Sequence, residues 1–211
     1  MLDRAHNFST SAGTVEQWQR AISPRLCSVD VSLPGTQAVF PASFATKTFA
    51  SGAFLRFDAP SQRLSRTSAA IAQDRTSDIA LVYLAAGDVT CQQFGREAHM
   101  RAQDCFAIDF SSPFDIMTVG RSQTLMITMS RAWVSRHLPP EEICSRRIDS
   151  GSCWGAPLST YLRAIYLDFD GEMPLSPVRI GEQALHLVEL ALGSVSSGLS
   201  THQSRSEEHT S

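Results

Sequence analysis

The chain has 211 residues, of which 43% are hydrophobic and 18% charged, so it can bury one sizeable core and is neither fibrous nor wholly disordered. Its net charge of -3 gives no basic surface for wrapping nucleic acid. The longest apolar stretch, Ile79 to Ala86, is too short to cross a bilayer and no secretion signal opens the chain, so we expect a soluble cytoplasmic protein without a membrane partner.

The first predicted element is a short helix that follows a polar start. Residues 1–12 are rich in Ser and Thr and are expected to be disordered. Thr14 and Gln17 have the spacing of a capping box, in which Thr14 accepts from the backbone of Gln17 and the Gln17 side chain reaches back. Trp18 lies on the apolar face of the predicted helix, and Pro24 ends it.

Short runs with a period of two follow between residues 27 and 129. Gly87 and Gly120 are expected to lie in turns between separate strands. Many short strands without intervening helices favour an antiparallel barrel, which also leaves no open sheet edge. We therefore expect residues 13–129 to form the opening helix and the barrel. The predicted strands cover residues 29–33, 44–48, 53–57, 62–68, 79–84, 89–94, 105–110, 114–118 and 124–129.

The helical period returns over residues 130–195. A short helix is predicted to begin at Ser130 and a longer one to carry an apolar stripe over residues 158–169. Ser176 is a cap residue followed by a first-turn proline, Pro177, which predicts the start of a third helix. The fold class is therefore mainly β with an appended α-helical layer, which is an α+β arrangement.

The end of the chain has a different composition. Residues 196–204 are rich in Gly, Ser and Thr and are interpreted as a linker. Residues 205–211 resemble the in-frame translation of a sequencing-library adapter, and we treat them as an artefact. On this hypothesis the natural chain is longer than the present sequence.

The sequence shows few of the residue patterns that mark a catalytic or metal-binding site. A metal site on a barrel needs two or three histidines with a carboxylate, and the strand region holds a single histidine, His99. The sequence contains no nucleophile elbow and no glycine-rich phosphate loop. The cysteines show no C-x-x-C pair and are expected to be reduced thiols. We expect no catalytic residue, no metal and no cofactor.

The interior of the barrel is the remaining candidate site, because a barrel of about eight strands can hold one small ligand. Arg56, Tyr83, Phe94 and His99 are the predicted ligand-binding residues, and Arg66 and Gln92 are further polar candidates for its lining. The alternative for Arg56 and Arg66 is an outward orientation as solvated strand charges.

Several segments resemble the N-terminal domain of AraC/XylS-type transcription regulators, in the AraC-binding-like branch. The resemblance lies in Leu64–Gln73, Ala80–Ile116 and Thr124–Pro139, and Trp18 in the opening helix also fits. Within the second segment, Gln93-Phe94-Gly95-Arg96 matches the family's hairpin and Asp109 to Phe114 its following strand end. One departure is Ala102-Gln103-Asp104, which stands where the family has Pro-Gly-Asp.

The resemblance implies a cupin-like barrel or jelly roll that senses an effector, followed by a helical dimerisation layer. It implies a homodimer, for which Leu162, Ile165, Leu187 and Val188 are the expected contact residues. It further implies a small aromatic or amine-derived effector, and DNA contact only through a C-terminal domain that this chain lacks. Two alternatives are a cupin-like metal-dependent enzyme and a stand-alone small-molecule-binding module.

Overall fold

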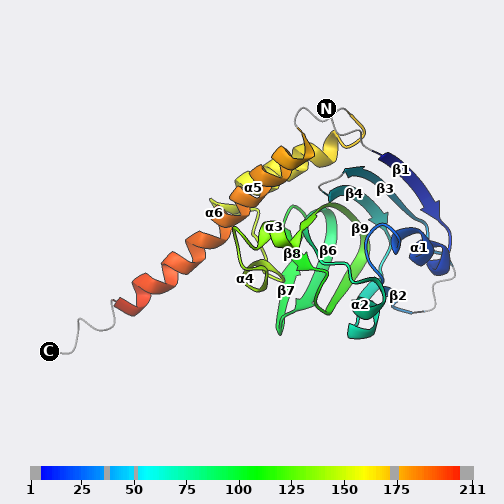
Figure 1. The fold of residues 1–211 in the computed structure, drawn as a ribbon, viewed down its shortest axis with the longest axis horizontal. Coiled ribbons are helices and arrows are strands. Elements are labelled where there is room, and N and C mark those ends of the chain that lie inside the picture. Colours follow the sequence, from blue (N-terminus) through cyan, green and yellow to red (C-terminus); the bar gives the residue numbers. More distant parts are fainter. Residues whose placement is uncertain (1–5, 36–38, 50–51, 172–175, 205–211) are drawn as a thin grey trace.

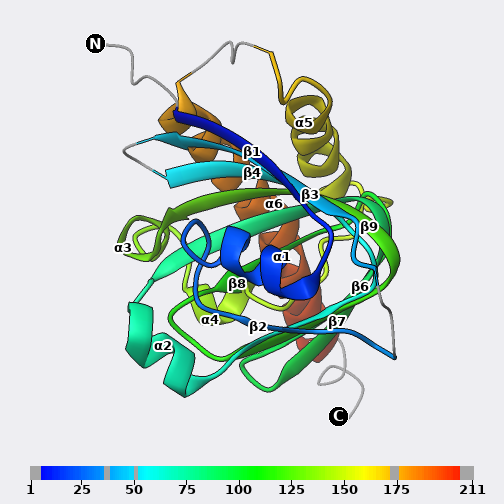
Figure 2. The same ribbon diagram turned by 90° about the vertical axis from the view of Figure 1, so that its right-hand side faces the viewer.

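One antiparallel sheet carries a helix on one face and a helical layer on the other (Figures 1 and 2). The computed structural model describes residues 6–35, 39–49, 52–171 and 176–204. Nine strands form the sheet over these residues, and it curves into a half-barrel. The prediction of a mainly antiparallel β fold with appended helices is confirmed.

Two long strands form the spine of the sheet. β6 (Asp78–Gln93) pairs with β9 (Phe114–Ser130) along nearly its whole length, with two register shifts close to Gly87. Gly87 has φ +98°, and a Cβ there would lie 2.8 Å from the carbonyl oxygen of Arg121. The prediction of separate strands with turns at Gly87 and Gly120 is wrong, because these glycines bend and bulge continuous strands.

The remaining strands pair on both sides of this spine. β9 pairs with β4 and β5, β4 continues to β3 and β1, and β5 pairs with β2. On the other side, β6 pairs with β7 and β8. The bounds are β1 His6–Ala12, β2 Asp30–Ser32, β3 Ala42–Phe49, β4 Gly52–Ala59, β5 Arg63–Arg66, β7 Arg96–Met100 and β8 Cys105–Asp109.

Strand β1 corrects the expectation of a disordered start over residues 1–12. His6–Ala12 pairs antiparallel with β3, and the ring of Phe8 lies 5.6 Å from the ring of Phe44. The guanidinium of Arg25 lies 3.5 Å from the centre of the Phe8 ring. A polar strand of this kind is fixed by the backbone hydrogen bonds of its neighbour, which its own sequence does not reveal.

The opening helix α1 (Val15–Ile22) has the predicted cap. Thr14 Oγ1 accepts from the backbone of Gln17 at 3.3 Å, and Gln17 Oε1 accepts from the backbone of Gly13 at 2.9 Å. The returning bond therefore reaches one residue further than in the usual capping box. Trp18 on the inner side of α1 is buried.

A second short helix, α2 (Ser68–Asp74), was not predicted. It buries none of its own residues, so it has no apolar periodicity to detect. Its last residue, Asp74, forms an ion pair of 2.6 Å with Arg66, whose side chain is completely buried. The hydrogen bond from Arg66 holds the pKa of the Asp74 carboxyl well below its ordinary value.

The helical layer consists of α3 (Arg131–Val134), α4 (Pro140–Ile143), α5 (Gly155–Leu167) and α6 (Pro177–Ser204). The predicted start of α6 is confirmed by the backbone of Arg179, which donates to Ser176 Oγ at 3.5 Å. α5 and α6 lie side by side, and α6 extends past α5 toward the C-terminus (Figure 1). None of the described helices is long and apolar enough to span a membrane.

The course of α6 corrects the prediction of a linker at residues 196–204, since the helix continues to Ser204. Once a helix is nucleated, each added residue completes one more backbone hydrogen bond, so a Gly/Ser run can prolong it. Residues 205–211, where we place the adapter-like tail, lie outside the described residues.

Two apolar cores lie on opposite faces of the sheet. The inner core lies under α1 and includes Trp18, Phe44, Val82, Phe106 and Ile116. The outer core lies between the sheet and the helical layer and includes Phe54, Tyr83, Ile127, Leu162 and Val188. Because side chains alternate along a strand, neighbouring residues of β6 such as Val82 and Tyr83 belong to different cores.

Candidate functional site

The inner core contains a cavity of about 60 Å³, which is the candidate effector site inside the half-barrel. Trp18 and Ile22 of α1 close it on one side, and β6, β8 and β9 supply most of its apolar wall. Its polar lining residues are Gln62, Thr118, Ser122 and Thr124, and none of its lining residues in the described part of the chain is charged. The cavity can therefore offer hydrogen bonds to a small neutral ligand.

A hydrogen-bond network fixes this polar side of the cavity. The indole Nε1 of Trp18 donates to Gln62 Oε1 at 2.9 Å, and both side chains are buried. The backbone of Gln62 donates to Thr118 Oγ1 at 3.0 Å, and the backbone of Thr118 donates to the Gln62 carbonyl at 2.9 Å. The network connects α1 to the start of β5 and to β9, so α1 is held over the cavity by a directional bond as well as by apolar contact.

The four predicted ligand residues do not meet in this cavity. Tyr83 is buried in the outer core, where its ring lies 6.3 Å from that of Tyr166 and burial raises the pKa of its hydroxyl. Arg56 lies on the same side of the sheet, where it forms an ion pair of 2.9 Å with Asp170 and covers the Phe169 ring at 4.7 Å. The expectation that Tyr83 and Arg56 line the barrel interior is wrong, because the pleat directs them to the helical layer.

Phe94 and His99 lie at the β6–β7 hairpin and are exposed. Phe94 (φ +53°) and Gly95 (φ +71°) form the tight turn, which directs the Phe94 ring outward. His99 Nδ1 lies 2.8 Å from Thr90 Oγ1 on the neighbouring strand. Neither side chain lines the inner cavity. Arg66 is also absent from its lining, because its guanidinium is used by Asp74 and by the carbonyls of Ser28 and Phe110.

Sequence reasoning missed Gln62 and Trp18 as cavity residues. The apolar helix face placed Trp18 in the core, but its pairing with Gln62 joins positions 44 residues apart. No local pattern marks such a pair, because it depends on how the first helix lies on the sheet.

The expected dimerisation residues divide into two groups. Leu162 and Val188 are buried in the outer core of their own chain, so their assignment as contacts with a second copy is wrong. Ile165 and Leu187 pack against the same core and are only partly buried. The large apolar side chains that the two helices do expose include Leu167, which is 69% exposed, and Leu190, which is 52% exposed.

Four of the five cysteines are buried thiols, and the fifth, Cys153, is exposed. Cys27, Cys91, Cys105 and Cys144 are buried, and burial raises the pKa of Cys27 to about 12 and of Cys91 to about 11. Among the residues that the structure describes, no three His, Cys, Asp or Glu side chains lie close enough to hold a metal ion. The alternative of a metal-dependent enzyme has no candidate centre within those residues.

The turn at Ala102-Gln103-Asp104, which departs from the family pattern, is formed around a residue with positive φ. Gln103 has φ +76° at the position where glycine is usual, and its backbone donates to the Leu84 carbonyl at 2.6 Å. Asp104 then accepts hydrogen bonds from the backbones of Arg101 and Ser150 and an ion pair from Arg147 at 2.6 Å. The turn thereby joins β8 to the segment that leads into α5.

A family model described as the AraC-binding-like domain matches residues 18–193, from the buried Trp18 to the middle of α6. No curated protein sequence matches the chain. The crystal structure of the AraC-like transcriptional activator CuxR is similar, with a TM-score of 0.75 and 14% identity over 89% of this chain and 69% of CuxR. This likeness shows a shared fold, and the predicted α+β class is confirmed.

Two further solved structures match about half of the chain. The cupin domain of Cnp3 from Schizosaccharomyces pombe has 14% identity and a TM-score of 0.36 over 50% of this chain and 74% of its own. A predicted oxalate decarboxylase from Thermotoga maritima has 11% identity and a TM-score of 0.34 over 50% of this chain and 94% of its own.

Proposed function

The chain belongs to the AraC-binding-like domain family, and from this premise we propose that it is the effector-sensing and dimerisation domain of an AraC-type transcription regulator. The observation that carries the proposal is the family match, which spans both the half-barrel and the helical layer. We further propose that the chain acts without catalysis, in the cytoplasm, where a regulator meets DNA.

The effector is proposed to bind in the inner cavity, held by Gln62 and the hydroxyls around it. A small aromatic or amine-derived compound is the class to screen first. The cavity of about 60 Å³ is smaller than the roughly 150 Å³ that holds a benzene ring in an engineered cavity, so a ring-sized effector must displace α1. Such a displacement breaks the Trp18–Gln62 hydrogen bond and gives binding a structural consequence.

A thermal-shift screen of such compounds tests the effector assignment. A ligand that binds only the folded state raises the melting temperature as its concentration exceeds its Kd. Gln62→Leu removes one amide from the polar side of the cavity and is expected to weaken the hit at least tenfold. Gln92→Leu is the matched control, because Gln92 is exposed on β6 outside the cavity. A hit that keeps full affinity in folded Gln62→Leu, or a screen without hits, contradicts the effector assignment.

Self-association is proposed to use the exposed apolar side of α6 around Leu187 and Leu190, which lie three residues apart on one helix face. Leu190→Glu is expected to give a folded monomer in sedimentation experiments, because a buried unpaired charge is costly at an interface. Gln183→Glu, at another exposed position of α6, controls for the added charge. Unchanged association of Leu190→Glu contradicts this interface.

A further inference from the structure

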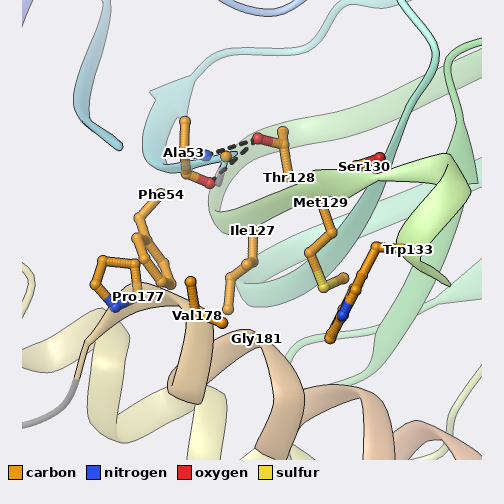
Figure 3. A pocket seen from close by; sticks show the side chains of 11 residues that line it. Ala53, Phe54, Ile127, Thr128, Met129, Ser130, Trp133, Pro177, Val178 and Gly181 are labelled. Carbon is orange, nitrogen blue, oxygen red and sulfur yellow. Dashed lines mark hydrogen bonds between the residues drawn. The ribbon is translucent and has the colours of Figure 1, made fainter. Parts of the chain in front are cut away.

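A second and larger cavity lies between the sheet and the helical layer, where the start of β4 and the end of β9 meet α3 and α6 (Figure 3). Its volume is about 200 Å³. Figure 3 shows Phe54 and Pro177 on one side, Met129 and Trp133 on the other, and Ile127 facing Gly181 between them. We refer to it as the sheet–helix cavity.

The size and chemistry of the sheet–helix cavity restrict what it can hold. An engineered apolar cavity of about 150 Å³ binds benzene, so a cavity of about 200 Å³ has room for one ring with a small substituent. None of the described residues that line it is charged, and a charged ligand would lose its hydration without gaining a partner among them. The suitable ligand is therefore neutral, compact and mostly apolar.

Gly181 keeps this cavity open. It lies inside α6, where glycine is unfavourable relative to alanine. Among the described residues, a Cβ at Gly181 would meet only Met129, at 3.6 Å from Sδ and 3.8 Å from Cγ, which is ordinary van der Waals contact. No steric conflict requires glycine here, so the consequence of the missing side chain is free volume next to Met129.

One polar group at the edge of the cavity is available to a ligand. Among the described residues, the indole Nε1 of Trp133 has no hydrogen-bond partner, and Trp133 lines the cavity. The exposed hydroxyl of Ser130 lies on the other side of β9 from the Met129 side chain and faces away from the cavity (Figure 3). A hydroxyl or carbonyl substituent on the ring can bind there, whereas Thr128 Oγ1 is already occupied by the backbone of Ala53.

We propose that the sheet–helix cavity is a binding site for a neutral single-ring molecule, separate from the site inside the half-barrel. A ligand there contacts the sheet through Phe54, Ile127 and Met129, and α6 through Val178 and Gly181. It therefore stabilises one position of α6 relative to the sheet. The consequence for self-association rests on the proposed function, because it needs α6 to be the dimer contact.

Methionine methyl NMR on the full chain separates the two sites in one spectrum. Of the six methionines, Met129 lines the sheet–helix cavity and Met126 lines the inner cavity. Titration with toluene is expected to shift the Met129 methyl signal in a saturable way and to leave the Met126 signal in place. Benzoate, which has the same ring and a charge, is expected to bind at least tenfold more weakly.

A cavity-filling variant provides the second test. Gly181→Leu places a side chain in the cavity and is expected to weaken toluene binding at least tenfold. Gln183→Leu adds the same side chain at an exposed position of the same helix and should leave binding unchanged. Sedimentation with and without toluene then measures whether occupancy changes self-association.

The outcomes separate this proposal from the proposed function. An unmoved Met129 signal up to the solubility limit of toluene, or full binding by folded Gly181→Leu, overturns the site. If Gly181→Leu does not fold, the wild-type Met129 titration decides alone. If toluene shifts the Met126 signal and leaves the Met129 signal unmoved, the ring binds in the inner cavity. That result overturns the sheet–helix site and leaves the proposed effector site standing. A chain that stays monomeric contradicts the proposed dimerisation. The Met129 titration still tests ligand binding in the sheet–helix cavity, because it does not depend on self-association.

Discussion

The two faces of the sheet are packed in different ways. On the inner face, aromatic rings interlock: Trp18 lies 5.8 Å from Phe44 edge to face, and Phe44 stacks on Phe57 at 5.7 Å. On the outer face, charged groups accompany the apolar contacts, including Lys47, which donates to the Gly171 carbonyl at 2.6 Å, and the Arg147–Asp104 ion pair. The inner face retains about 60 Å³ of free volume and the sheet–helix cavity about 200 Å³.

This difference indicates which contact can change without unfolding the protein. Interlocked rings in a filled core resist displacement, because any shift leaves cavities that cost stability. A helical layer that already borders free volume and is joined by polar contacts can move at lower cost. We therefore expect the helical layer to adjust more readily than the inner face, where displacement of α1 requires breaking the ring contacts of Trp18 as well as its hydrogen bond to Gln62.

The largest expected effect is the removal of the inner aromatic anchor. Trp18→Ala deletes a side chain that is 1% exposed, and it is expected to lower the free energy of unfolding by about 3–5 kcal/mol. Trp18→Phe keeps a ring but leaves Gln62 Oε1 without its donor, at a cost of about 1–3 kcal/mol. Urea unfolding measures both, and a loss below about 1 kcal/mol for Trp18→Ala contradicts a rigid inner face.

Acid is expected to weaken the attachment of the helical layer through Asp104. Burial alone would raise the pKa of this carboxyl, but hydrogen bonds from Arg147 and from the backbones of Arg101 and Ser150 outweigh it and lower the pKa. The stability from Asp104 is therefore present above its unfolded pKa of about 3.9 and is lost as the pH falls through the lower folded pKa.

A variant isolates this contribution of Asp104. Asp104→Asn is expected to lose about 1–3 kcal/mol of unfolding free energy at pH 7, and the difference from wild type should shrink near pH 2. Urea unfolding at both pH values measures it. A difference that does not change with pH would mean that the ionised form of Asp104 contributes nothing.

A smaller gain is expected at the sheet–helix cavity. Gly181→Ala adds one methyl group without a close contact and improves helix propensity, so it should raise stability by about 0.5–1 kcal/mol. Thermal unfolding at neutral pH measures the change. A destabilised Gly181→Ala would show that this part of α6 already packs tightly on the sheet.

The smallest effect is expected at the turn before β8. Gln103 adopts φ +76°, which costs a residue with a side chain about 1 kcal/mol. Gln103→Gly removes this strain but gains freedom in the unfolded chain, so the net stabilisation should be about 0.5 kcal/mol or less. Loss of stability on this substitution, measured by urea unfolding, would contradict a strained turn.

Elements with local signals were predicted well from the sequence. The cap at Thr14 and the start of α6 at Pro177 each depend on residues within one helical turn, so they can be recognised without a fold. β1 and α2 lack such signals, because one is fixed by a distant strand and the other buries no residue.

The candidate site depended on information that the sequence does not contain. Period-two alternation shows that Val82 and Tyr83 face opposite sides of a strand, but it does not show which side lies inside the half-barrel. The bend at Gly87 has the same local composition as a turn, so the lengths of β6 and β9 were also missed. The first error exchanged the two faces and selected Tyr83 where Gln62 lines the cavity.

The buried amine of Lys47 has a practical consequence. It is the only lysine in the chain, its side chain lies under the segment that follows α5, and it is 8% exposed. An acylating reagent that modifies primary amines can therefore reach the Lys47 side chain only when that segment lifts from the sheet. The rate of Lys47 acylation, followed by mass spectrometry, therefore reports how often the helical layer opens, and no engineered label is required.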